Sequence, residues 1–325
     1  PDPEQAGGRG AEIHGLIPPC LGHNLCRTFT DKENPMPVVP APAATLEIGS
    51  TRLSFVPDGV THQRPAAMFA NVGPEFWAEH PEEFDEHGWL IMTFGSFLVQ
   101  SGDRNALIDL GWGPKTVDLA EFSGGQMEGD SIGGDLLDNL AALGVAPTDI
   151  DTVLFSHLHP DHVGWAADAG GSAVFPNAVN VLTEQELAFW FTSPEAAATG
   201  VAPDDAQAAV LKEQVRVVAD GDSPFPGVSI MVTAGHTPGH ASFVVSGADR
   251  RAIVLGDAVH CPIELVVPNL GFVHDVDPGQ AAAAQARLDR ELTRPGTVVA
   301  GGHFPAPAFR KLLDTTPREF GPLED

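Results

Sequence analysis

The sequence is poor in several residue types, and each shortage excludes a class of structure or partner. Its 325 residues contain no tyrosine, so no phenol hydroxyl is available to any binding site. Only 17 lysines and arginines stand against 44 aspartates and glutamates. The resulting net charge of −27 disfavours nucleic acids and anionic membranes as partners, because both require basic patches. No apolar run approaches the roughly 20 residues that span a bilayer, so no membrane segment is expected.

Cysteine is also scarce, and only Cys20, Cys26 and Cys261 are present. An odd, sparse set argues against a disulfide framework and fits a reducing compartment. Residues 1–10 show neither the basic start nor the apolar core of a signal peptide, so we expect a cytoplasmic protein. Cys20, His23 and Cys26 have a spacing that suits a metal ion. No fourth ligand lies near them, and their role stays open.

Proline and glycine dominate the first 43 residues, which lack hydrophobic periodicity. This composition predicts a disordered or extended N-terminal arm over residues 1–43. Residues 44–325 are long enough for one large domain, and we expect them to form a single catalytic unit.

Strand and helix patterns alternate along this domain. Helical spacing or capping signals predict helices over residues 133–143, 183–190, 203–218 and 278–292, with Asp277 as the N-cap of the last. Short apolar or alternating runs predict strands over residues 51–57, 88–100, 105–110, 151–155, 177–182, 228–233, 241–245, 251–255 and 297–300. Strands followed twice by helices favour an α/β sandwich with helices outside two sheets.

The densest signal is the segment Ser-His-Leu-His-Pro-Asp-His at residues 156–162. His157, His159, Asp161 and His162 offer the nitrogen and oxygen ligands that zinc prefers. Packing does not explain such a run, since each buried polar side chain would need its own partner.

Other candidate ligands also follow predicted strands. His236 lies in Gly-His-Thr-Pro-Gly-His, Asp257 follows Ala-Ile-Val-Leu-Gly, and His303 follows Thr-Val-Val-Ala-Gly-Gly. Five histidines and two aspartates are too many for one tetrahedral ion, so we expect two ions. One would take His157, His159 and His236, the other would take Asp161, His162 and His303, and Asp257 would bridge them together with a hydroxide.

These motifs, in this order, resemble the signature of the metallo-β-lactamase superfamily over roughly residues 50–305. The resemblance implies an αββα sandwich of two mixed sheets with helices on the outer faces. It also implies that Asp109, in Leu-Ile-Asp-Leu-Gly, and His240 stand behind the ligands rather than among them. His260 is expected to line the pocket or to stand behind the ligands, whereas His274, Asp275 and Asp277 lie in a loop where solvation is the default.

The resemblance implies a metal-dependent hydrolase with two zinc ions, although Mn²⁺, Co²⁺ or Fe²⁺ would also suit the ligands. Asp161 and Asp257 would be catalytic, with Asp161 orienting the hydroxide and accepting a proton. The expected partner is a small molecule: an ester, a lactone or a phosphotriester. The alternatives are a mononuclear iron oxidoreductase similar to persulfide dioxygenases, a thioesterase similar to glyoxalase II, and a binding or sensor protein without turnover.

The end of the sequence resembles the methyl parathion hydrolase and lactonase branch, because His303 is followed at once by Phe-Pro. Homoserine lactonases place a tyrosine near the metals, and this chain has none. His260 or the metal itself would then have to hold the substrate oxygen. Residues 68–88 are expected to form a lid or a dimerisation arm, so a homodimer stays open, as does the natural substrate.

Overall fold

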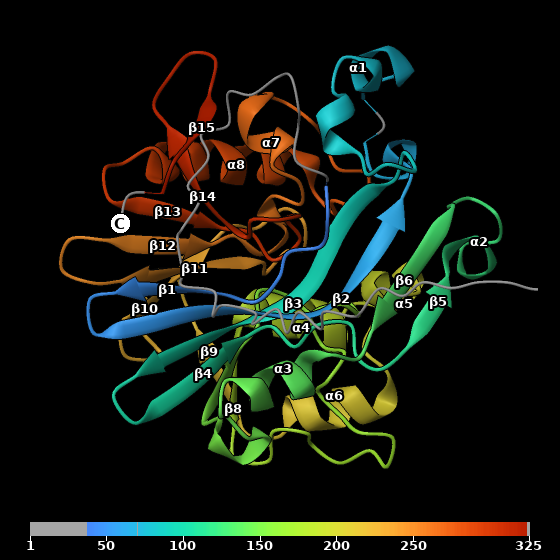
Figure 1. Cartoon of the computed structure of the whole chain (residues 1–325). Coiled ribbons are helices and arrows are strands. Elements are labelled where there is room, and N and C mark those ends of the chain that lie inside the picture. Colours follow the sequence, from blue (N-terminus) through green and yellow to red (C-terminus); the bar gives the residue numbers. More distant parts are fainter. Residues whose placement is uncertain (1–37, 70, 324–325) are drawn as a thin grey trace, which may run out of the picture.

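Two β-sheets stacked face to face form the body of the protein (Figure 1). The computed structural model describes residues 38–69 and 71–323, so Cys20, His23 and Cys26 lie outside the described residues. The predicted sandwich of two mixed sheets with outer helices is confirmed.

The first sheet is nine-stranded and mixed, with the order β5-β6-β2-β3-β4-β7-β8-β9 and β1 beside β2. Its parallel part runs from β4 to β9, and its remaining pairs are antiparallel. The strands are β1 Ala44–Ile48, β2 Thr51–Gln63, β3 Leu90–Ser101, β4 Arg104–Ile108, β5 Thr116–Asp118, β6 Gly129–Gly133, β7 Thr152–Leu154, β8 Val179–Thr183 and β9 Val215–Val218.

The second sheet is six-stranded and follows chain order from β10 to β15. Only β12 and β13 pair in parallel, because α8 connects them. The strands are β10 Val228–Val232, β11 Ala241–Ser246, β12 Arg251–Val254, β13 Thr297–Ala300, β14 Phe309–Leu313 and β15 Glu319–Gly321.

The helices are short except for α8. In Figure 1, α3 and α6 lie on one side of the paired sheets, and α7 and α8 lie on the other. The α-helices are α1 Pro74–Ala78, α2 Leu119–Phe122, α3 Leu136–Ala142, α4 Glu184–Thr192, α5 Pro194–Thr199, α6 Asp205–Lys212, α7 Ile263–Val266 and α8 Pro278–Leu292. The 3-10 helices are η1 Pro65–Ala67, η2 Pro81–Glu83, η3 Pro147–Asp149 and η4 Gly256–Ala258.

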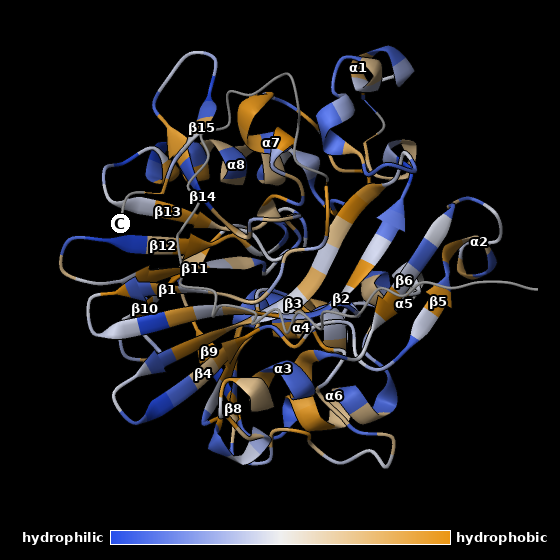
Figure 2. Ribbon diagram, viewed as in Figure 1, coloured by the Kyte–Doolittle hydropathy of each residue, from blue (hydrophilic) through white to orange (hydrophobic). Residues whose placement is uncertain are grey.

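Side-chain alternation along the strands builds three apolar layers. In β4, Ala106 and Ile108 pack between the sheets, while Leu107 packs outward beneath the helical layer that contains α3 and α4. In β13, Val298 packs inward and Val299 outward, toward α8. Strands that are apolar on both faces read as continuous hydrophobic runs, which is why they stand out in the sequence. Figure 2 shows these runs along the central strands, with hydrophilic residues toward the hairpin ends.

Most predicted elements are confirmed, and α8 has the predicted bounds. The Asp277 carboxylate caps this helix by accepting from the backbone N–H groups of Gly279 and Gln280. One prediction is wrong: the helix expected over residues 203–218 ends at Lys212, and Val215–Val218 forms the edge strand β9. These four residues, three of which are β-branched, form a strand because they can pair with β8 at the edge of the sheet.

The N-terminal arm is described only from residue 38 onward. The backbone N–H of Ala41 donates to Thr93 Oγ1, and the carbonyl of Val39 accepts from Ala306. The last residues of the predicted arm therefore lie against β3 and the segment after His303. The extent of an arm over residues 1–37 stays a prediction.

The segment expected to be a lid or a dimerisation arm forms η1, α1 and η2, and it packs on the body of the protein. Phe69 and Trp77 are buried in one cluster with Cys261 and Leu270. Among the described residues no helix combines the length and the apolar character that crossing a membrane requires.

Candidate metal centre

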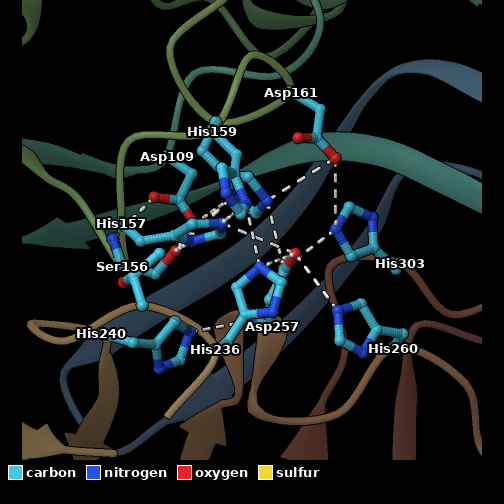
Figure 3. A network of polar contacts seen from close by, with 12 residues as sticks. Asp109, Ser156, His157, His159, Asp161, His236, His240, Asp257, His260 and His303 are labelled. Carbon is cyan, nitrogen blue, oxygen red and sulfur yellow. Dashed lines mark hydrogen bonds and ion pairs between the residues drawn. The ribbon is translucent and has the colours of Figure 1, made fainter. Parts of the chain in front are cut away.

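The predicted ligands meet at one edge of the sandwich, because each of them follows the end of a strand (Figure 3). Residues 156–162 follow β7, and residues 233–240 connect β10 to β11. Asp257 follows β12 in η4, and His303 follows β13. Turns mounted on rigid strands can aim several side chains at one point.

The seven side chains fall into the two predicted groups. His157, His159, His236 and Asp257 form the first group, and Asp161, His162, Asp257 and His303 form the second. Within each group the donor atoms lie within 4.8 Å of one another. The structure therefore brings together every predicted ligand, while their function as ligands stays a prediction.

Asp257 belongs to both groups, and its two oxygens divide between them. Oδ2 lies 3.6 Å from His157 Nε2 and 3.5 Å from His236 Nε2. Oδ1 lies 3.1 Å from His162 Nε2 and 2.9 Å from His303 Nε2. This is the position that a bridging carboxylate requires.

In three of the histidines a protein acceptor faces the outer ring nitrogen, Nδ1. His162 Nδ1 donates to Asp109 Oδ2 at 2.9 Å, and His236 Nδ1 donates to Asp275 Oδ1 at 3.1 Å. His303 Nδ1 donates to the carbonyl of Thr93 at 3.0 Å. Each ring thus turns Nε2 inward, the orientation that metal-binding histidines have.

Several inward atoms lack the partner that a buried polar atom needs. His162 Nε2 and Asp257 Oδ1 are buried without a hydrogen bond. His159 Nδ1 lies 2.8 Å from His157 Nε2 and 2.9 Å from His236 Nε2. A cation between these three nitrogens would satisfy all of their lone pairs at once, whereas one N–H of His159 can serve only one of the two contacts well. The donor set and these orphaned atoms fit divalent metal ions.

Burial and charge act differently on the two groups. Burial lowers the pKa of His157, His159 and His236 well below 6.5, which keeps these rings neutral and able to bind a cation. Burial also opposes a charge on His162, but the carboxylates of Asp257, Asp161 and Asp109 raise its pKa well above 6.5.

Asp109 connects β4 to the ligand segment. Its Oδ1 accepts from the backbone N–H of Ser156 at 2.8 Å, and its Oδ2 accepts from Ser156 Oγ at 2.7 Å. The same Oδ2 holds His162. The residue adopts φ 61°, a left-handed conformation that aspartate tolerates better than most residues. Asp109 thus lies behind the candidate ligands, the position that the resemblance implies.

His240 also lies behind the ligands and outside both groups. Its Nδ1 faces Thr233, so its Nε2 is free to accept the backbone N–H of Asp257 at 2.9 Å. Burial lowers the pKa of His240 to about 3, which keeps Nε2 as an acceptor. A Cβ at Gly256 would lie 2.5 Å from this nitrogen, so glycine is required there.

His260 lies beside Asp257, with its Nε2 3.4 Å from Oδ2. Its ring stacks on Phe272 at a centroid distance of 3.5 Å and is buried. Burial opposes the charged form, yet Asp257 and Glu264 raise the pKa of His260 to about 10. His260 therefore lies against Asp257 and outside both groups of candidate ligands, and its role stays a prediction.

Two residues of the site were missed in the sequence. Asp275 was expected in a solvated loop, and this is wrong: its carboxylate binds His236 Nδ1, with 6% of the side chain exposed. Glu186 in α4 is buried behind the first group. No local motif marks either residue. Both reach the site because the loop that carries His236 packs against their segments, the loop before α8 and the start of α4.

A protein-family model described as the metallo-beta-lactamase superfamily matches residues 96–303. The N-acyl homoserine lactonase AttM of Agrobacterium fabrum is 31% identical over 128 residues, which are 37% of this chain and 44% of that protein. The N-acyl homoserine lactonase of Bacillus thuringiensis is 26% identical over 219 residues, covering 64% of this chain and 79% of that protein.

The fold is also similar to solved structures. The dizinc quorum-quenching lactonase AidC, solved with a product bound, superposes with a TM-score of 0.74 at 21% identity. The superposition covers 88% of this chain and 98% of the other. At this identity the likeness shows a shared fold.

Proposed function

The chain belongs to the metallo-β-lactamase superfamily and is one of its metal-dependent hydrolases, and we propose that it opens lactones, N-acyl homoserine lactones in particular, with two divalent ions bound. The observation that carries the proposal is the division of Asp257 between two groups of inward-facing imidazoles. One carboxylate in that position links two sites rather than completing one.

The nitrogen and oxygen ligands favour zinc, and other first-row divalent metals also bind such ligands. His157, His159 and His236 would hold one ion, Asp161, His162 and His303 the other, and Asp257 both. When bound, such a pair supplies a water of lowered pKa and a Lewis acid for the substrate oxygen.

Asp161 is suited to the proton transfer. Its Oδ2 lies 3.5 Å from His303 Nε2 and 3.7 Å from His162 Nε2, and 19% of its side chain is exposed. The side chains of Asp257 and His303 are only 6% and 4% exposed. Asp161 therefore stands at the open side of the centre, where it can orient an attacking water and accept its proton.

The surroundings support a substrate with an apolar group. Val273 and Val276 are 40% and 43% exposed, and the backbone N–H of Val276 donates to the carbonyl of His236. Val276 therefore lies beside the first group, and its exposed apolar side chain suits an acyl chain there. With no tyrosine in the chain, we expect the metal ions or His260 to hold the oxygen of the substrate.

The test is a hydrolysis screen on the purified full chain with its metal content measured on the same sample. Substrates are N-acyl homoserine lactones of different acyl length, an aryl ester, a phosphotriester, a thioester and a β-lactam. We expect two metal ions per chain and the highest kcat/KM on a lactone. Asp257→Asn should lose activity, while the exposed Asp138→Asn should retain it. One iron per chain with no hydrolysis would favour the oxidoreductase alternative, and a preference for the thioester would favour the glyoxalase II-like one.

A further inference from the structure

Glu186 is a buried carboxylate that accepts four hydrogen bonds and belongs to neither group of ligands. It lies in α4, and its residue is 1% exposed. Oε1 accepts from the backbone N–H of Leu158 at 3.0 Å and from Trp190 Nε1 at 2.5 Å. Oε2 accepts from Thr237 Oγ1 at 2.6 Å and from the backbone N–H of Gly239 at 3.2 Å. Burying a charged group this deeply is costly, so the four donors indicate a built arrangement.

The four donors lie in the two loops that carry the first group of ligands or contact one of these ligands. Leu158 lies between His157 and His159, and Thr237 directly follows His236. The Trp190 ring packs edge-on against His159 at a centroid distance of 5.3 Å. None of the four donors adjoins the ligands that belong to the second group alone.

The loop that carries His157 and His159 and the loop that carries His236 share few backbone hydrogen bonds. The N–H of Ala241 donates to the carbonyl of Ser156, just outside the ligand positions. Close approach of α4 also explains one residue of the Gly-His-Thr-Pro-Gly-His motif: a Cβ at Gly239 would lie 2.0 Å from the backbone nitrogen of Glu186. The loop therefore lies directly on the start of the helix, and Glu186 holds it there.

We propose that Glu186 is a positioning residue for the first group alone: its two oxygens hold the His157–His159 loop and the His236 loop at the spacing at which they bind one metal ion together. This inference rests on the proposed metal centre and adds a residue that controls one half of it. Loss of Glu186 should weaken the first group and leave the second nearly unchanged.

Glutamine is the sharpest substitution because it keeps the shape of the side chain. One oxygen can still accept from Leu158 and Trp190, but the amide nitrogen cannot accept from the N–H of Gly239. Thr237→Val removes one donor without loss of volume, and Thr237→Ser keeps the hydroxyl as its matched control.

The experiment measures Zn²⁺ affinity in single-site proteins of the full chain. His303→Ala disables the second group, and His159→Ala disables the first. We expect Glu186→Gln to weaken Zn²⁺ binding about tenfold or more in the His303→Ala protein and less than about twofold in the His159→Ala protein. Thr237→Val should act in the same direction, and Thr237→Ser should not.

Asp58→Asn is the control for losing a buried carboxylate as such. Asp58 is also fully buried and accepts from Trp112, Gly113 and Trp165, among others, but none of these donors is next to a ligand of the first group. Asp58→Asn should destabilise the fold and change Zn²⁺ affinity equally in the two single-site proteins.

The outcomes separate the two proposals. Equal weakening in both single-site proteins, or none in either, would overturn the role of Glu186 while the metal centre stands. Should Glu186→Gln fail to fold, the Thr237 pair decides in the same two backgrounds. A parent protein that binds no Zn²⁺ would instead overturn the proposed function.

Discussion

Replacing Asp109 by asparagine tests whether the protein presets the tautomer of His162. Asp109 Oδ2 accepts the proton of His162 Nδ1, which leaves Nε2 free to face Asp257 and Asp161. In Asp109→Asn the amide oxygen can keep the bond from the Ser156 backbone N–H. The amide nitrogen then faces Nδ1, and the ring must carry its proton on Nε2, where it blocks the metal position.

The structure separates the effect on metal binding from the effect on folding. Loss of the partner behind a metal-binding histidine typically costs about 10–100-fold in affinity, or about 1.4–2.8 kcal/mol. Asparagine tolerates φ 61° as aspartate does, so backbone strain should be unchanged. We expect a loss of about 1 kcal/mol in the unfolding free energy of the metal-free protein. Asp109→Ala should cost about 3 kcal/mol, because it leaves the buried N–H of Ser156 without an acceptor and His162 Nδ1 with only the longer contact to Ser156 Oγ at 3.4 Å.

The assay combines urea unfolding of the metal-free variants with Zn²⁺ titration against a competing chelator. Asp138→Ala, an exposed position in α3, is the control for removing one negative charge. If Asp109→Asn folds and binds both ions as tightly as the parent, the tautomer argument is wrong. If it loses metal only in proportion to its lost stability, Asp109 supports the fold and not the ligand.

Three further results are expected. Verified removal of metal by a chelator should lower both activity and the melting temperature, since metal binds only the folded chain; an unchanged melting temperature would contradict a buried centre. Asp161→Asn should leave the melting temperature of the metal-free protein nearly unchanged and reduce kcat by about 100-fold or more, and parent-like hydrolysis of every substrate would refute its role. Burial raises the pKa of Glu186 from 4.5 to about 7, so folded protein keeps a proton that the unfolded chain releases between these values. In the metal-free protein, the unfolding free energy should therefore fall as pH rises through that window. Glu186→Gln should remove roughly 3 kcal/mol of this decrease. If the unfolding free energies of parent and variant change in parallel with pH, the pKa of Glu186 is ordinary.

The ligands could be predicted because they sit on features that a sequence displays directly. Apolar runs such as Asp151–Phe155 mark strands buried on both faces, and the polar residues that follow them have to lie at a sheet end. His157, His236 and His303 were located in this way, and their convergence followed from the topology. The same logic failed for Val215–Val218, where a free sheet edge outweighed a local pattern that favours a helix.

The residues that orient the ligands could not be predicted in the same way, and the reason is geometric. A ligand presents one ring nitrogen to the metal, and its other nitrogen needs an acceptor on the far side of the ring. That acceptor belongs to whatever chain segment packs there: Thr93 in β3 for His303, and Asp275 in the loop before α8 for His236. The separations are 210 and 39 residues, and a backbone carbonyl serves as well as a carboxylate. Asp109 and His240 were expected behind the ligands only because the motifs resemble those of the metallo-β-lactamase superfamily. In the structure, Asp109 directly follows β4, whose parallel pairing with β7 brings it beside the ligand segment. The partners of His236 and His303 depend on how distant segments pack together, and no local sequence pattern shows that packing.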